Sequence, residues 1–191
     1  QPKICNYLDM PLQHISDPVL QRMRRQITSE ETKQLIQNIR SIHPEIRLRT
    51  TFLVGFPGET EEDHRALCDF VEEMKFDRVG VFEYSHEEGT RGYNFTDDVP
   101  SEIKKQRAED IMAIQRTISW SHNQEWIGKQ VKVLIDRKEG GQFVGRTEFD
   151  SPEVDNEVWM EGSQGALQPG QFAVVQITSA SDYDLTGILI D

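Results

Sequence analysis

The chain has 191 residues, of which 21 are Lys or Arg and 33 are Asp or Glu, so its formal net charge is −12. A hydrophobic content of 36 % excludes wholesale disorder, and the excess of acid argues against general binding to phosphate backbones. No apolar run approaches the roughly 18 to 20 residues of a membrane span. The two cysteines, Cys5 and Cys68, form no disulfide framework and no metal-ligand cluster, so we expect a reducing cytoplasm.

The charge is spread unevenly along the chain. Residues 1–55 carry 8 basic and 5 acidic side chains, a net charge of +3. Residues 56–128 carry 8 and 17, a net charge of −9, and residues 129–191 carry 5 and 11, a net charge of −6. Binding partners must therefore be judged segment by segment.

Strand and helix signals alternate through residues 1–127. Three apolar runs predict strands: residues 4–8, 46–54 and 79–84. Capping-box pairs, Thr28 with Glu31 and Thr60 with Asp63, predict the starts of two helices, and residues 101–126 read as a third, long helix. Strands alternating with helices predict an α/β domain with a parallel sheet.

After Gly128 the pattern changes to an alternation of apolar and polar residues, beginning with Val131, Val133 and Ile135. Four further runs predict strands: residues 143–149, 158–160, 172–177 and 185–190. Five short strands in about sixty residues predict a small five-stranded antiparallel β-barrel of the OB type. We therefore expect two domains, residues 1–127 and 128–191.

Each predicted strand of the α/β part is followed by a polar cluster. Asp9, Gln13 and His14 follow the first, a Gly55-Phe-Pro-Gly-Glu59 turn follows the second, and residues 83–90 follow the third. The carboxyl ends of parallel strands lie at one edge, where βα barrels bind their ligands. The clusters together predict a ligand site, although the Gly55–Glu59 turn alone also fits an ordinary strand-to-helix loop.

Three strings resemble the radical S-adenosylmethionine (SAM) methylthiotransferases: residues 7–14 (YLDMPLQH), 49–60 (RTTFLVGFPGET) and 82–90 (FEYSHEEGT). The barrel after Gly128 resembles their TRAM domain, so the resemblance covers nearly the whole chain. It implies a partial (βα) barrel, the C-terminal half of a radical SAM TIM-like barrel, followed by TRAM. Residues 145–155 resemble the ribosomal-protein branch (RimO-type), which adds a methylthio group to an aspartate β-carbon of a small-subunit ribosomal protein.

The resemblance also implies which residues contact the cofactor. The family's Gly-x-Ile-x-Gly-x-x-x-Glu pattern falls on Thr51, Leu53, Gly55 and Glu59, with Thr51 in place of the usual Gly. The SAM contacts implied are Gln13, Arg49, Thr51, Gly55, Glu59, Phe82 and Tyr84, the last two flanking the adenine. For Arg49, an ion pair with Asp9 is the alternative.

The family's cysteine triplet, Cys-x-x-x-Cys-x-x-Cys, does not occur in this chain. The 4Fe–4S clusters of the full-length enzyme would then have their ligands elsewhere, because such clusters are held by three or four thiolates. We therefore expect no metal ligand and no catalytic residue in this chain, and a C-terminal fragment that is inactive by itself.

The charge of residues 129–191 bears on the choice of substrate. A TRAM-like barrel with a net charge of −6 should repel tRNA phosphates and attract a basic small-subunit ribosomal protein. Two alternatives stay open: a tRNA adenosine methylthiotransferase (MiaB-type), and a non-catalytic RNA- or ribosome-binding module built on an OB-like barrel.

Overall fold

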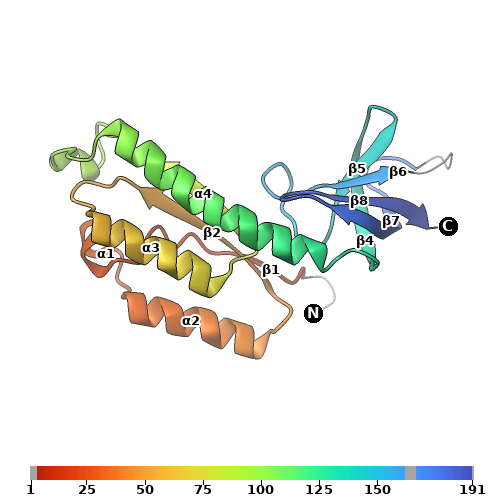
Figure 1. The fold of residues 1–191 in the computed structure, drawn as a ribbon, viewed down its shortest axis with the longest axis horizontal. Helices are drawn as coiled ribbons and strands as arrows, with labels where there is room; N and C mark the ends of the chain where they lie inside the picture. The colour runs from red at the N-terminus through yellow and green to blue at the C-terminus, as the bar shows by residue number, and fades with distance from the viewer. Residues whose placement is uncertain (1–3, 162–166, 191) are drawn as a thin grey trace. The chain divides into compact units, whose positions relative to one another are not determined.

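The computed structural model describes residues 4–161 and 167–190. The chain divides into two compact units, one formed by Leu8–Gln115 and the other by Arg116–Asp191 together with Gln1–Tyr7. The elements up to residue 124 are, in order, β1 (Tyr7–Asp9), α1 (Asp17–Arg22), α2 (Ser29–Ile42), β2 (Arg47–Val54), α3 (Glu61–Met74), β3 (Arg78–Glu83), a 3-10 turn η1 (Gly92–Asn94) and α4 (Ser101–Gln124) (Figure 1).

Both predicted capping boxes are confirmed. At the start of α2, Thr28 Oγ1 accepts a hydrogen bond from the Glu31 N–H at 3.2 Å, and Glu31 Oε2 accepts one from the Thr28 N–H at 2.8 Å. At the start of α3, Thr60 and Asp63 exchange the same two bonds at 3.2 and 2.9 Å. These bonds satisfy N–H groups that a helix start leaves without a partner.

β1, β2 and β3 form a three-stranded sheet in that order, and β2 pairs with β3 in parallel. Side chains of β2 alternate between buried and half-buried. On the buried face, Phe52 packs edge-to-face against Phe70 of α3 and Phe76, with ring centroids 6.2 and 6.0 Å apart. The helices therefore cover one face of the sheet (Figure 1), and the opposite face carries Arg49 and Thr51.

The second unit contains a closed barrel of five strands in the order β4-β5-β6-β8-β7. The strands are β4 (Gln130–Glu139), β5 (Gln142–Arg146), β6 (Val158–Glu161), β7 (Phe172–Ala180) and β8 (Leu185–Ile190). Its interior is filled by alternate side chains, among them Val133, Ile135 and Met160. A Cβ atom at Gly145 would collide with the carbonyl oxygen of Leu134, so glycine permits the close approach of β4 and β5.

The prediction that this barrel is antiparallel is wrong for one of its pairs. β6 and β8 run parallel, with Val158 opposite Leu185 and Trp159 opposite Thr186, whereas the other four pairings are antiparallel. The reason is one of parity, because strand direction cannot alternate all the way round a closed ring with an odd number of strands. Five strands that close must place at least one parallel pair somewhere.

Several strand boundaries also differ from expectation, by up to three residues. The first strand begins at Tyr7 rather than at Ile4, which is 68 % exposed and lies outside β1. β5 ends at Arg146 rather than at residue 149, because the Thr147 hydroxyl turns to donate a hydrogen bond to Asp150 Oδ2 at 2.6 Å. Within the described ranges, no helix is both long and apolar enough to cross a membrane.

Candidate functional site

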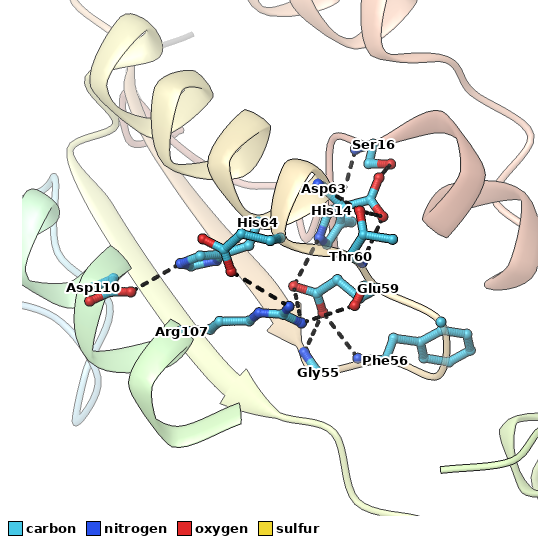
Figure 2. Close-up of polar contacts among 12 residues, drawn as sticks. His14, Ser16, Gly55, Phe56, Glu59, Thr60, Asp63, His64, Arg107 and Asp110 are labelled. Carbon is cyan, nitrogen blue, oxygen red and sulfur yellow. Dashed lines mark hydrogen bonds and ion pairs between the residues drawn. The ribbon is translucent and has the colours of Figure 1, made fainter. Parts of the chain in front are cut away.

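The turn between β2 and α3 is held from inside by Glu59 (Figure 2). Glu59 Oε2 accepts hydrogen bonds from the backbone N–H groups of Gly55 and Phe56, the latter at 3.1 Å. The carboxylate is completely buried. It therefore closes the Gly55–Glu59 turn on itself, directly where β2 ends.

Two further elements lie against the buried carboxylate of Glu59. Arg107 of α4 places Nη1 3.3 Å from Glu59 Oε1 and donates to the Glu59 carbonyl oxygen at 3.2 Å. His14, which follows β1, has Nε2 3.8 Å from Glu59 Oε1. The Ser16 N–H donates to His14 Nδ1 at 3.0 Å, so the proton of the neutral ring is on Nε2, facing Glu59. One carboxylate thus connects β1, β2, α3 and α4.

Asp63 makes a second connection next to this one (Figure 2). It accepts a hydrogen bond from the Ser16 hydroxyl and two more from the N–H and hydroxyl of Thr60, at 2.9 and 2.8 Å. Burial opposes ionisation of Asp63, but these hydrogen bonds and the nearby His14 outweigh it and keep the pKa of the carboxyl below its ordinary value. The starts of α1 and α3 are joined through this charge.

Three of the residues predicted to contact the cofactor share the open face of the sheet. Arg49, Thr51 and Phe82 lie on adjacent strands, and Thr51 is opposite Gly80 in the pairing of β2 with β3. Gly80 presents no side chain there, and a Cβ at this position would lie 3.5 Å from Arg49 Nη2 and 3.6 Å from Thr51 Oγ1. Phe82 is 61 % exposed. The expected ion pair of Arg49 with Asp9 is present, at 2.9 Å.

The other four predicted contacts are at the carboxyl ends of the strands, in different surroundings. Gln13 follows β1 with a left-handed backbone (φ 71°) and pairs with Phe52 as an isolated parallel bridge. Gly55 also has positive φ (74°), and a Cβ there would collide with Lys104. Glu59 is the buried carboxylate of the turn, and Tyr84 is buried against Phe56, whose ring centroid is 5.1 Å away. Burial, with carboxylates nearby, raises the pKa of Tyr84.

Two adjoining pockets near Gln13 contain arginines that are not among the contacts predicted from the sequence. One pocket, of about 240 Å³, is lined by Gln13, Leu53 and Phe56 among others, and the second measures about 400 Å³. Three arginines line both: Arg22, Arg24 and Arg91. The run Arg22-Met-Arg-Arg in a segment of positive net charge is a sequence signal for two of them. No sequence signal indicates Arg91, because it is far from Arg22 and Arg24 in the chain.

Cys68 does not offer a reactive thiol. Its Sγ lies 3.6 Å from Nε2 of His64, whose ring is 3.1 Å from Asp110. Burial, together with several surrounding carboxylates led by Asp110, raises the pKa of Cys68 to about 11, so the thiol stays protonated at neutral pH. Within residues 4–161 and 167–190, no group of three or more His, Cys, Asp or Glu side chains is arranged to hold a metal ion.

Comparison with known proteins agrees with this architecture. Residues 2–71 match the radical SAM superfamily, and residues 127–190 match the TRAM domain. The chain is therefore a partial radical SAM domain joined to a TRAM domain. Among solved structures, the radical SAM enzyme coproporphyrinogen III oxidase (HemN) from Escherichia coli aligns with 75 % of this chain and 39 % of its own, at 19 % identity and a TM-score of 0.48.

Curated relatives make the assignment more specific. The ribosomal protein uS12 methylthiotransferase RimO of Flavobacterium psychrophilum is 53 % identical over 98 % of this chain, and that of Porphyromonas gingivalis is 50 % identical over all of it. The chain spans 43 and 44 % of the length of these two relatives. It belongs to the RimO family of radical SAM methylthiotransferases.

Replacing Glu59 with Ala should destabilise the Leu8–Gln115 unit by about 3 to 5 kcal/mol, because Arg107 would be left buried without its counter-charge. Equilibrium unfolding in urea measures the loss. The matched control is Glu61→Ala, at the start of α3, whose carboxylate is 66 % exposed and lies 4.0 Å from the same arginine. It should cost less than about 1 kcal/mol, and equal losses for the two variants would contradict a central role for Glu59.

Replacing Asp63 with Asn should cost about 1 kcal/mol at pH 7 through loss of the charged cap. Since the folded pKa of Asp63 lies below the unfolded value of about 3.9, its contribution is present above that value and is lost as the pH falls through the folded pKa. The difference between variant and wild type should therefore shrink as the pH falls below about 3.9. Urea unfolding at pH 7 and at pH 2 tests this, with Asp69→Asn, exposed on the same helix, as the control.

Proposed function

We propose that this chain is part of a radical SAM methylthiotransferase that adds a methylthio group to the β-carbon of an aspartate in ribosomal protein uS12. The observation that carries the proposal is an identity of about half with RimO proteins over nearly the whole chain. The polar clusters at the carboxyl ends of β1, β2 and β3 support it, since this edge is where βα barrels bind ligands. We also propose that the enzyme acts in the cytoplasm.

The residues of the open sheet face fit a SAM molecule. Gly80 presents no side chain beside Arg49 and Thr51, and exposed Phe82 offers an aromatic surface on the same face. In the proposed site, Gln13, Arg49, Thr51, Gly55, Phe82 and Tyr84 would bind or border the cofactor, while buried Glu59 would hold the turn in position. When bound, SAM supplies the radical and the methyl group that the reaction requires.

The 4Fe–4S clusters of the family do not fit this chain. Its two cysteines, Cys5 and Cys68, cannot provide the three thiolates that a cluster needs. Cys68 in particular is kept as a thiol by its surroundings. We therefore assign no step through a cluster to these residues, and we propose that the chain is inactive by itself.

We propose that the barrel binds the basic protein substrate. Residues 129–191 carry 11 acidic and 5 basic side chains, a balance that attracts a basic protein and repels tRNA. A second candidate, an RNA-binding role or the tRNA-modifying activity, is favoured by the strand order β4-β5-β6-β8-β7, which we interpret as an OB-type barrel. OB folds often bind oligonucleotides, but the net charge of −6 favours the protein substrate.

A chimaeric enzyme tests the activity. The part of the Flavobacterium psychrophilum RimO that aligns with this chain, 187 residues long, is replaced by this chain, and the rest of that enzyme is kept. After reconstitution with iron and sulfide under reducing conditions, the chimaera should turn over SAM and modify one aspartate of uS12, as read by peptide mass spectrometry. Modification of tRNA instead, or of neither by a folded chimaera with intact clusters, would overturn the proposal.

Reversing charge on the barrel tests the partner. Glu148, Glu153 and Glu161 are exposed, and all three are replaced with Lys. This variant, immobilised, should capture uS12 about tenfold more weakly at low salt and should capture more tRNA. The control reverses three exposed carboxylates of the other unit, Glu62, Glu72 and Glu102, which changes the net charge equally. Equal weakening by both sets would mean that net charge alone, and not the barrel, attracts the substrate.

A further inference from the structure

We propose that Arg22, Arg24 and Arg91 form a carboxylate-binding subsite that receives the side chain of the aspartate to be modified. This inference rests on the proposed function and names the contact that would select an acidic side chain. Its basis is geometric, since the three arginines line both of the adjoining pockets, which measure about 240 and 400 Å³. Gln13, a predicted cofactor contact, lines the first pocket, so the subsite borders the proposed SAM site.

Arg24 occupies a position where the backbone favours glycine. It follows the C-terminal end of α1 in the left-handed region, with φ 58°. The Arg24 and Arg25 N–H groups donate to the carbonyl oxygens of Gln21 and Leu20 at 3.0 and 2.8 Å, the pattern of a Schellman motif. A long charged side chain at a position of this kind costs backbone energy, and such strain is concentrated at functional sites.

Arg22 is fixed in place by the turn that follows β2. Its Nη1 donates to the Gly58 carbonyl oxygen at 2.6 Å. A Cβ at Gly58 would collide with the same guanidinium, so the glycine of the Gly-Phe-Pro-Gly turn makes room for the arginine. The Nη1 atom of the Arg22 guanidinium is therefore held by the turn. Among the described residues, its Nη2 and Nε atoms donate no hydrogen bond.

Arg24 and Arg91 have no carboxylate of the described chain within 4.0 Å. With Arg25, which also lines the smaller pocket, four like charges surround the two pockets and repel one another. A guanidinium binds carboxylate or phosphate through paired N–H donors. The arginine-lined pockets therefore contain no carboxylate of the described chain and are complementary to an anionic ligand.

A carboxylate on a macromolecule fits better than the carboxylate of the cofactor. All three arginines are exposed, whereas the predicted cofactor contacts Arg49, Thr51 and Phe82 lie on the sheet face and do not line these pockets. An aspartate carboxyl group is bonded directly to the β-carbon that the proposed reaction modifies. Holding this group beside Gln13 would orient that carbon toward the cofactor.

Binding to the full 191-residue chain tests the subsite. The probe is a capped Gly-Asp-Gly tripeptide, followed through the side-chain Nε–H signals of the arginines by NMR. The signals of Arg22, Arg24 and Arg91 should shift and saturate, and the matched Gly-Asn-Gly tripeptide should shift none of them. Arg24→Gln and Arg91→Gln should each raise the Kd at least about tenfold, the effect of losing a hydrogen bond to a charged group. Arg65→Gln, exposed on α3, should leave the Kd unchanged.

Arg24→Gly separates binding from folding. Because glycine suits the left-handed backbone, this variant should keep or raise the melting temperature while the tripeptide affinity falls to the level of Arg24→Gln. A lower melting temperature would indicate a structural role and would overturn the inference. Inorganic phosphate and SAM are each titrated separately in the same NMR experiment. If either shifts the three arginine signals and the aspartyl tripeptide does not, the subsite is wrong, whereas the activity of the chimaera is judged independently.

Discussion

The α/β unit depends on one buried carboxylate. Glu59 is the last residue of the turn between β2 and α3, and it contacts the backbone of that turn, the guanidinium of Arg107 and the ring of His14. A charge in such a place is costly unless donors and a counter-charge surround it, and the Gly55 and Phe56 N–H groups and Arg107 supply them. Through this single group, segments 48 residues apart are brought to the edge where the strands end.

That constraint explains why the two faces of the sheet differ. The face with Phe52 is filled by aromatic rings of α3 and its C-terminal loop, and Arg107 of α4 is tied to the same side through Glu59. The opposite face keeps Arg49 and Thr51 half-exposed beside Gly80. Apolar packing is therefore concentrated on the covered face, and polar side chains lie on the other.

The barrel is governed by a different constraint, closure. Because an odd number of strands closes the ring, a parallel pair is unavoidable, and β6 and β8 supply it. Closure also leaves no free sheet edge in the barrel, so its surface meets partners through side chains rather than through backbone pairing. In the proposed role, the acidic balance of residues 129–191 is the property that a partner encounters first.

Local features of the fold could be predicted from the sequence, because their causes lie a few residues apart. The capping boxes of Thr28 and Thr60 set two helix starts, and the apolar run of residues 46–54 marked β2. The ordered motifs at the strand ends indicated the family as well, since each is a continuous string of residues. The start of the first strand was misplaced, since an apolar residue such as Ile4 becomes part of a strand only where its backbone pairs with another strand.

What the sequence by itself determined is therefore the order of elements, the change from an α/β part to a β-barrel, and the family. Only the tertiary structure decided that Glu59 is buried and held by Arg107, that β6 and β8 are parallel, and that Arg91 lines the same pockets as Arg22 and Arg24. The physical reason is that these contacts join residues far apart in the chain. Such contacts leave no periodic or local signal in the sequence, because they depend on how the whole chain closes on itself.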